Sequence, residues 1–132
     1  IKAGPNPCYI PSLDQVVIPQ PSRFDQSEEF YSTLYHELIH STGHPSRLDR
    51  KAVNKAQFDR GEYSKEELIA EMGAAFLCGH AGISPPVIEN QAAYIRGWLS
   101  ALQGDNYMVI KAASAAQKAS DYILGETEKT DE

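Results

Sequence analysis

The segment His36-Glu37-Leu38-Ile39-His40 constrains the fold of this 132-residue chain more than any other. Apolar residues recur around it at helical spacing, in two neighbouring lines: Phe30, Leu34 and Leu38, and Tyr31, Tyr35 and Ile39. The pattern predicts a helix that starts at Asp25 or Ser27 as its N-cap and stops at Gly43 as its C′ residue. Two histidines four residues apart then share one face of that helix, with their Cβ atoms about 5–6 Å apart.

The rest of the sequence predicts an α+β, mostly helical domain. Two β-prone runs, Cys8–Ile10 and Gln15–Ile18, flank a turn and predict a small N-terminal antiparallel hairpin fenced by prolines. Three further helices are expected, which makes about four in all. The first of these three begins at Ser64 as its N-cap, with Glu67 in the capping-box position. The next runs from about 87 to 102, and the last stops at Gly125. We expect one domain over 1–125 and a charged, frayed tail over 126–132.

The same periodicity predicts which residues form the core. The helix after Ser64 would bury one face, and the helix near 87–102 another. The final helix would use its alanines for close packing. The expected core residues are Leu68, Ile69, Met72, Ala75, Phe76, Tyr94, Ile95, Trp98, Leu99, Leu102, Ala112, Ala113, Ala115, Ala116 and Ala119.

Composition and charge exclude several classes of protein. The formal net charge is -6, which argues against a domain that grips nucleic acid by neutralising its phosphates. No apolar run is long enough to span a membrane, and we expect no secretory signal, because the first residues do not show a charged stretch followed by an apolar one. Cys8 and Cys78 are too few for a disulfide framework, so we expect separate reduced thiols and a cytoplasmic location. The chain begins at Ile1, so we expect a fragment with a possible upstream domain.

The histidine pair predicts a metal site. Two imidazoles one turn apart can reach one Zn²⁺ ion at about 2.0–2.1 Å. Glu37 is one step around the helix, where it can accept a proton from a zinc-bound water and so act as general base. Surface histidines are the alternative, but the intervening Leu38 and Ile39 are apolar, which favours partial burial and ligand binding.

A catalytic zinc needs a third protein ligand, and the second helix offers Glu67 and Glu71 on one face. The run from 67 to 71 resembles the ExxxD arrangement of glutamate-ligand zinc peptidases. There the first acid binds the metal and the second orients a ligating histidine. If Glu67 instead closes a capping box with Ser64, Glu71 becomes the ligand. His44 is out of register for the HExxHxxGxxH pattern, and His80 has no motif around it.

Larger blocks of the sequence resemble the C-terminal metallopeptidase domain of ArdC-type antirestriction proteins, the polyvalent-protein zincin-like domain. The similar blocks are residues 9–19, residues 35–50 (YHELIHSTGHPSRLDR), residues 66–77 (EELIAEMGAAFL), residues 91–99 and residues 117–124. The resemblance implies a zincin-like fold, one zinc ion, and carriage by plasmids or phages. In many members an upstream domain binds single-stranded DNA, so nucleic acid binding would come only through such a domain.

These observations lead to two functional hypotheses. The first is a zinc-dependent peptidase that acts on a peptide or protein, with Gln15–Ile18 as an edge strand for the substrate. Tyr63, His44 and Arg47 are possible transition-state or substrate contacts, although surface ion pairs are the favoured explanation for Arg47 and Arg50. The second is a metal-stabilised acidic module that blocks a DNA-processing restriction enzyme without proteolysis.

Overall fold

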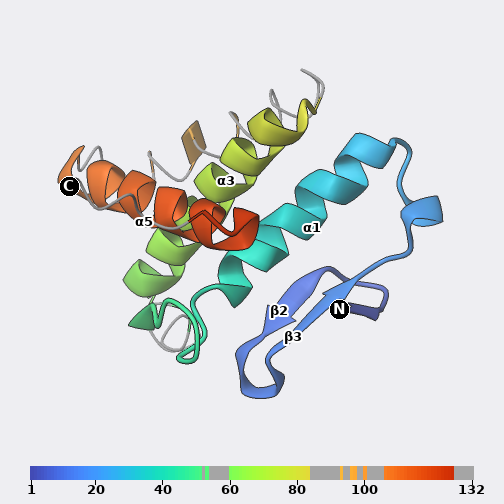
Figure 1. Cartoon of the computed structure of the whole chain (residues 1–132), viewed down its shortest axis with the longest axis horizontal. Helices are drawn as coiled ribbons and strands as arrows, with labels where there is room; N and C mark the ends of the chain where they lie inside the picture. Colours follow the sequence, from blue (N-terminus) through green and yellow to red (C-terminus); the bar gives the residue numbers. More distant parts are fainter. Residues whose placement is uncertain are drawn as a thin grey trace.

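The computed structural model describes residues 1–51, 53, 60–83, 93, 96–97, 100 and 106–126. Helix α1 (Ser27–Ser41) lies between a small sheet and helix α3 (Arg60–Ala81), and α3 packs in turn against helix α5 (Asn106–Leu124) (Figure 1). The fold is therefore α+β and mostly helical, as the sequence predicted. The expected helix over 87–102 and its inner face lie outside the described residues, apart from positions 93, 96–97 and 100, which are helical.

The sheet contains the predicted hairpin and one additional strand. Strands β2 (Cys8–Ile10) and β3 (Gln15–Ile18) are antiparallel, which confirms the hairpin, and β1 (Lys2–Ala3) pairs with β3 in parallel. The strand order is β1-β3-β2, so β3 is central. The expectation that Gln15–Ile18 forms an edge strand is therefore wrong, and β2 lies at an edge instead. A two-residue strand has no alternating pattern, so nothing in the sequence indicated β1.

Polar contacts tie the hairpin turn to the segment after α1. The turn is a short 3-10 helix (Pro11–Leu13), followed by Asp14 in the left-handed region with φ of 48°. The Tyr9 hydroxyl donates to Asp14 Oδ1 at 2.8 Å, and the Arg47 guanidinium forms an ion pair with the same oxygen. Arg47 also donates from Nε to the carbonyl of Ser41 at 2.8 Å. The hairpin is thereby fixed to the C-terminal end of α1.

Helix α1 begins and ends differently from the prediction. Its N-cap is Gln26, and within the described residues no side chain caps it, so the expected caps Asp25 and Ser27 are both wrong. Glu28 and Glu29 lie in the first turn, where negative charge stabilises the helix end. Gly43 does follow the helix, but its φ is not positive. It is needed for space, because a Cβ there would collide with Val53 and come within 3.1 Å of Arg50 Nη2.

Helix α3 starts at Arg60, before the predicted cap. Ser64 is therefore inside the helix, and the capping box expected between Ser64 and Glu67 does not form. Leu68 and Ile69 are buried as predicted, but Phe76 is 39% exposed. Ala70, Ala74 and Cys78 are buried in its place, because α3 packs against α1 on one side and α5 on the other. A helix between two neighbours buries a wider arc than a single amphipathic face.

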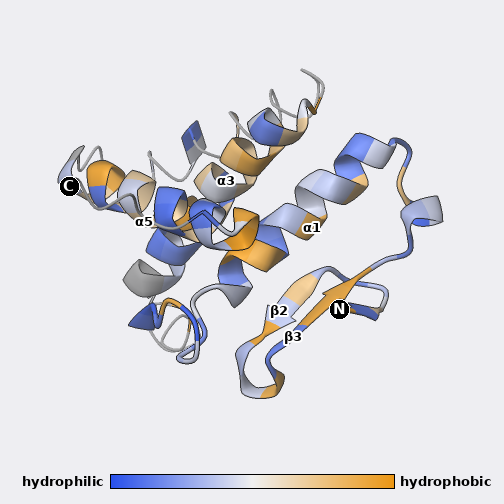
Figure 2. Ribbon diagram, viewed as in Figure 1, coloured by the Kyte–Doolittle hydropathy of each residue, from blue (hydrophilic) through white to orange (hydrophobic). Residues whose placement is uncertain are grey.

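The core lies where the three helices meet, and hydrophobic residues also line β3 (Figure 2). The alanines of α5 pack closely, as expected: Ala112, Ala116 and Ala119 are almost fully buried. The same helix ends at Leu124, and Gly125 follows with a φ of 73°, which confirms the predicted stop. Residues 127–132 of the expected tail lie outside the described residues.

Two further expectations concern the membrane and the thiols. In the described part of the chain, no helix combines the length and the apolar character that a membrane span requires. Cys8 in β2 and the buried Cys78 in α3 are both thiols, in agreement with the sequence analysis.

The contact between Ile39 and Gly73 sets the spacing between α1 and α3. A Cβ at position 73 would lie 2.6 Å from Ile39 Cδ1 and 2.8 Å from its Cγ1, and Ile39 has no exposed surface. We expect Gly73→Ala to lower the free energy of unfolding by about 1–3 kcal/mol through overpacking. Urea unfolding followed by circular dichroism measures this change.

Gly79→Ala is the matched control on the same helix. Among the described residues, nothing lies within 4 Å of a Cβ at Gly79, so this substitution should be neutral or stabilise the helix by up to about 1 kcal/mol. Equal effects of the two substitutions would contradict the packing role of Gly73.

Candidate metal centre

The two histidines of α1 face the same point on α3. His36 and His40 are one turn apart, and their Nε2 atoms are 3.1 Å from each other. Ile39, which lies between the two histidines in the sequence, is fully buried against α3. This contact fixes the rotation of α1 about its own axis. The structure therefore brings the predicted pair together on one partly buried face, rather than on the solvent side of an amphipathic helix.

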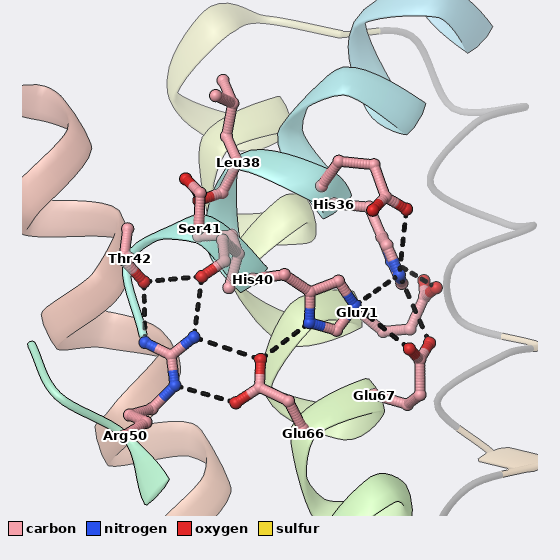
Figure 3. A network of polar contacts seen from close by, with 11 residues as sticks. His36, Leu38, His40, Ser41, Thr42, Arg50, Glu66, Glu67 and Glu71 are labelled. Carbon is pink, nitrogen blue, oxygen red and sulfur yellow. Dashed lines mark hydrogen bonds and ion pairs between the residues drawn. The ribbon is translucent and has the colours of Figure 1, made fainter. Parts of the chain in front are cut away.

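Helix α3 presents Glu67 to both imidazoles. Its carboxylate oxygens lie 3.3 Å from His36 Nε2 and 3.0 Å from His40 Nε2. One ligand atom from each of the three residues can be chosen so that all lie within 4.8 Å of one another. Figure 3 shows the side chains converging from the two helices. Two imidazole nitrogens and one carboxylate form a donor set that suits a divalent transition metal ion.

The opposite nitrogen of each ring contacts a different carboxylate of α3. His36 Nδ1 is 2.8 Å from Glu71 Oε1, and His40 Nδ1 is 2.7 Å from Glu66 Oε2 (Figure 3). An ionised carboxylate only accepts hydrogen bonds, so each Nδ1 carries the proton that it donates. Both Nε2 atoms are then directed toward Glu67. Glu71 therefore lies where a residue that orients a ligating histidine is expected, and Glu67 lies between the rings.

Glu66 is a residue that the sequence reasoning missed, and Arg50 is one that it misplaced. Arg50 Nε donates to Glu66 Oε1 at 2.9 Å, and Arg50 Nη2 to Glu66 Oε2 at 3.1 Å. The two side chains are only 11% and 3% exposed, so the expectation of a surface ion pair for Arg50 is wrong. The signal available in the sequence was the adjacent pair of acids at 66 and 67, together with an arginine that ends the similar block over 35–50.

Glu37 is buried beside the histidines. Its side chain is 10% exposed, and its Oε1 lies 3.9 Å from His36 Nε2. Burial raises the pKa of Glu37, although His40 and His36 oppose this effect. A carboxylate with a raised pKa is a better proton acceptor near neutral pH than an ordinary surface glutamate.

Charge interactions within the cluster strongly shift the pKa values of its members. Burial disfavours the charged imidazoles, but Glu67 and Glu71 outweigh it and raise the pKa of His36 to about 10. Glu66 and Glu67 likewise raise the pKa of His40 to about 9 against its burial. The pKa of Glu67 falls to about 2, because its bonds to both rings outweigh its own burial. The carboxylates of the cluster thus favour the positively charged form of both imidazoles.

A cavity of about 490 Å³ opens beside these residues. It is bounded by the edge strand β2 on one side and by the acids and His40 on the other. The lining residues are Pro7, Cys8, Tyr9, Ile10, Pro11, Glu37, His40, Val53, Tyr63, Glu66 and Glu67. The side of β2 that does not pair with β3 is therefore the strand edge nearest to the site, in the position that the sequence analysis gave to β3.

Of the other residues that the sequence suggested for the site, some line this cavity and others lie outside it. Tyr63 lines the cavity, and its pKa is raised by the charge of Glu67, by burial and by Glu37, so its hydroxyl keeps its proton. His44 instead accepts a hydrogen bond from the Ser46 amide at 3.1 Å. Arg47 pairs with Asp14. His80 is exposed at the end of α3, and in the described part of the chain it is not among the residues that converge with His36.

Comparison with known proteins places the chain in a family. The profile of the zincin-like metallopeptidases matches residues 1–115. A DNA primase TraC of Escherichia coli is 39% identical over 127 residues, which are 96% of this chain and 9% of the primase. The uncharacterized protein y4eC of Sinorhizobium fredii (strain NBRC 101917 / NGR234) is 33% identical over 120 residues, which are 91% of this chain and 38% of that protein.

Two crystal structures of the antirestriction ArdC protein from the R388 plasmid are also similar. The metal-free structure has a TM-score of 0.71 and 40% identity, and covers 93% of this chain and 44% of that one. The Mn(II)-bound structure has a TM-score of 0.69 and 36% identity, and covers 94% and 45%. The chain thus spans less than half of each of these relatives. It has a zincin-like fold, and it belongs to the zincin-like metallopeptidase family.

Proposed function

We propose that this chain is a metal-dependent peptidase domain whose ion is held by His36, His40 and Glu67. The observation that carries the proposal is the convergence of these three donors from two helices, with a buried Glu37 beside them. The donor chemistry fits Zn²⁺, the ion we propose. The Mn(II)-bound relative supports a divalent metal ion in this family.

A divalent ion at this position would supply Lewis-acid activation of water and of the scissile carbonyl. In this proposal, Glu37 would accept a proton from the attacking water and deliver it to the leaving amine. Its raised pKa suits both halves of that task, because a group that accepts a proton must also release it. Glu71 and Glu66 orient the imidazole rings, because each accepts a hydrogen bond from the Nδ1 atom of one histidine.

The cavity provides for the substrate backbone. Strand β2 is at the edge of the sheet and lines the cavity, so an extended peptide can add to it through main-chain hydrogen bonds. Tyr63 lines the same cavity with a protonated hydroxyl, and it is the residue that we propose as hydrogen-bond donor to the developing oxyanion. Of the three residues considered for this role, Tyr63 lines the cavity, whereas His44 and Arg47 are not among its lining residues.

The relatives suggest the biological setting. We propose that the domain acts within a longer cytoplasmic protein with an antirestriction role, and that its substrate is a protein of DNA processing. This rests on the similarity to the ArdC and TraC proteins. Contact with nucleic acid would come through another part of such a protein, because this chain carries a net charge of -6.

The decisive experiment is Glu37→Gln. The amide keeps the size of the side chain but cannot accept a proton, so peptide cleavage should fall by about 10²–10⁴-fold. Metal content and the thermal unfolding midpoint should stay close to wild type. Cleavage is measured by mass spectrometry of a peptide library incubated with the zinc-loaded protein.

The same variant separates the peptidase from a non-catalytic binding module. Loss of antirestriction activity together with cleavage supports proteolysis as the function. Full antirestriction activity in Glu37→Gln, or a wild type that cleaves nothing in the library, would favour a metal-stabilised module that blocks its target by binding.

Glutamate-to-alanine substitutions identify the third ligand. Glu67→Ala removes a direct donor, and should weaken Zn²⁺ binding by more than Glu71→Ala does. The latter removes only the partner of His36, for which a loss of about 10–100-fold is typical. Chelator competition measures both dissociation constants. A larger loss in Glu71→Ala would make Glu71 the ligand.

Metal binding should release protons at neutral pH. In the metal-free protein the pKa values of His36 and His40 are about 10 and about 9, so both rings hold protons that the ion must displace. Affinity for Zn²⁺ should therefore rise as pH increases from 6 toward 9. Calorimetry at pH 7 in buffers of different ionisation enthalpy measures the released protons. His80→Asn should leave the number unchanged, and a buffer-independent heat in the wild type would contradict the expectation.

A further inference from the structure

The carboxylate of Glu66 is shared between a metal-site histidine and an arginine. Glu66 is only 2% exposed, and its Oε2 lies 2.7 Å from His40 Nδ1. Arg50 approaches the same carboxylate in a fork, with Nε at 2.9 Å from Oε1 and Nη2 at 3.1 Å from Oε2 (Figure 3). A bidentate arginine fixes the plane of a carboxylate as well as its position. The orientation of Glu66 is therefore determined from the side opposite to His40.

Arg50 is itself anchored to the helix that carries His40. Its Nη2 donates to the carbonyl of Ile39 at 2.7 Å, and its Nη1 to Thr42 Oγ1 at 2.6 Å. Thr42 in turn donates to the same carbonyl of Ile39 at 2.6 Å. The guanidinium thus contacts the residue just before His40 and the C-cap residue of α1, two positions after it. The absence of a side chain at Gly43 makes room for it, since a Cβ there would lie 3.1 Å from Nη2.

We propose that Arg50 and Glu66 are positioning residues that aim the Nε2 atom of His40 at the metal. Arg50 holds Glu66 in one orientation, Glu66 holds the Nδ1 side of the ring, and the opposite nitrogen faces Glu67. The proposal rests on the metal site described above. It gives Arg50 a role that an ordinary ion pair would not need, because the planar fork of arginine is required and not only its positive charge.

The test uses two variants in the intact chain. Arg50→Lys keeps the charge but cannot form the fork. Glu66→Gln keeps the shape and leaves Arg50 its contacts to Ile39 and Thr42, but its amide offers only one acceptor to Arg50 and His40. Each should weaken Zn²⁺ binding by about 10–100-fold in chelator competition, which is the usual effect of losing a partner of a ligand. Each should also change the visible absorption spectrum of the Co²⁺-loaded protein, because the position of a ligand has changed.

Arg47→Lys is the matched control. Arg47 also ties the segment after α1 to that helix, through the Ser41 carbonyl, but its ion pair is with Asp14 and not with a carboxylate of the site. The Arg47→Lys substitution should leave the Zn²⁺ affinity within twofold of wild type and the Co²⁺ spectrum unchanged. Circular dichroism of the metal-free variants shows whether each one folds. If Arg50→Lys does not fold, Glu66→Gln decides.

The double variant tests whether Arg50 acts through Glu66. If it does, Arg50→Lys in the Glu66→Gln background should weaken binding by no more than about twofold further. Two fully multiplicative losses, or single variants that bind Zn²⁺ as the wild type does, would overturn the proposal. Because the readout is metal binding, a wild type that binds metal without cleaving peptides ends the proposed peptidase and leaves this inference standing. Nitrogen NMR of the His40 ring, compared between wild type and variants without metal, reads the Glu66 contact directly.

Discussion

The pairing of buried carboxylates with imidazoles across the α1–α3 interface is the interaction on which the rest of this structure depends. Glu66 and Glu71 are each less than 10% exposed, and charges at such depth are costly unless they are paired and hydrogen-bonded. The two helices solve this together, because α1 supplies the rings and α3 supplies acids for both nitrogens of each ring. The cost of burying the acids is thereby offset by the same contacts that shape the site.

Helical periodicity explains why so much of the site could be predicted. His36 and His40, and likewise Glu67 and Glu71, are four residues apart, so each pair had to share one face. Glu66 was missed because neighbouring residues on a helix point about 100° apart, and a helix touched on two sides buries more than one stripe. Arg50 lies in a polar stretch outside any helix, where only the tertiary structure reveals that its fork is enclosed.

The errors at the helix and strand ends have a common origin. The capping patterns at Asp25 and Ser64 did not predict the starts of α1 and α3, because packing contributes more to the stability of a helix in a protein than its local cap does. The hairpin and the end of α5 were predicted correctly, because proline and glycine act there through the backbone alone. The parallel pairing of β1 with β3 depends on contacts distant in sequence, and it covers the edge of β3 that a two-stranded hairpin would leave open.

The insertion of Ile39 against the bare backbone of Gly73 has a consequence for how this domain can diverge. Ile39 is next to His40, and Gly73 is two residues beyond Glu71, so the space at this contact sets the distance between the two helices that carry the proposed ligands. Volume added at one position must be removed at the other if the helices are to stay in register. In related chains, a larger residue at position 73 should therefore occur together with a smaller residue at position 39. Such paired changes would preserve the distance between the helices, and with it the proposed metal site.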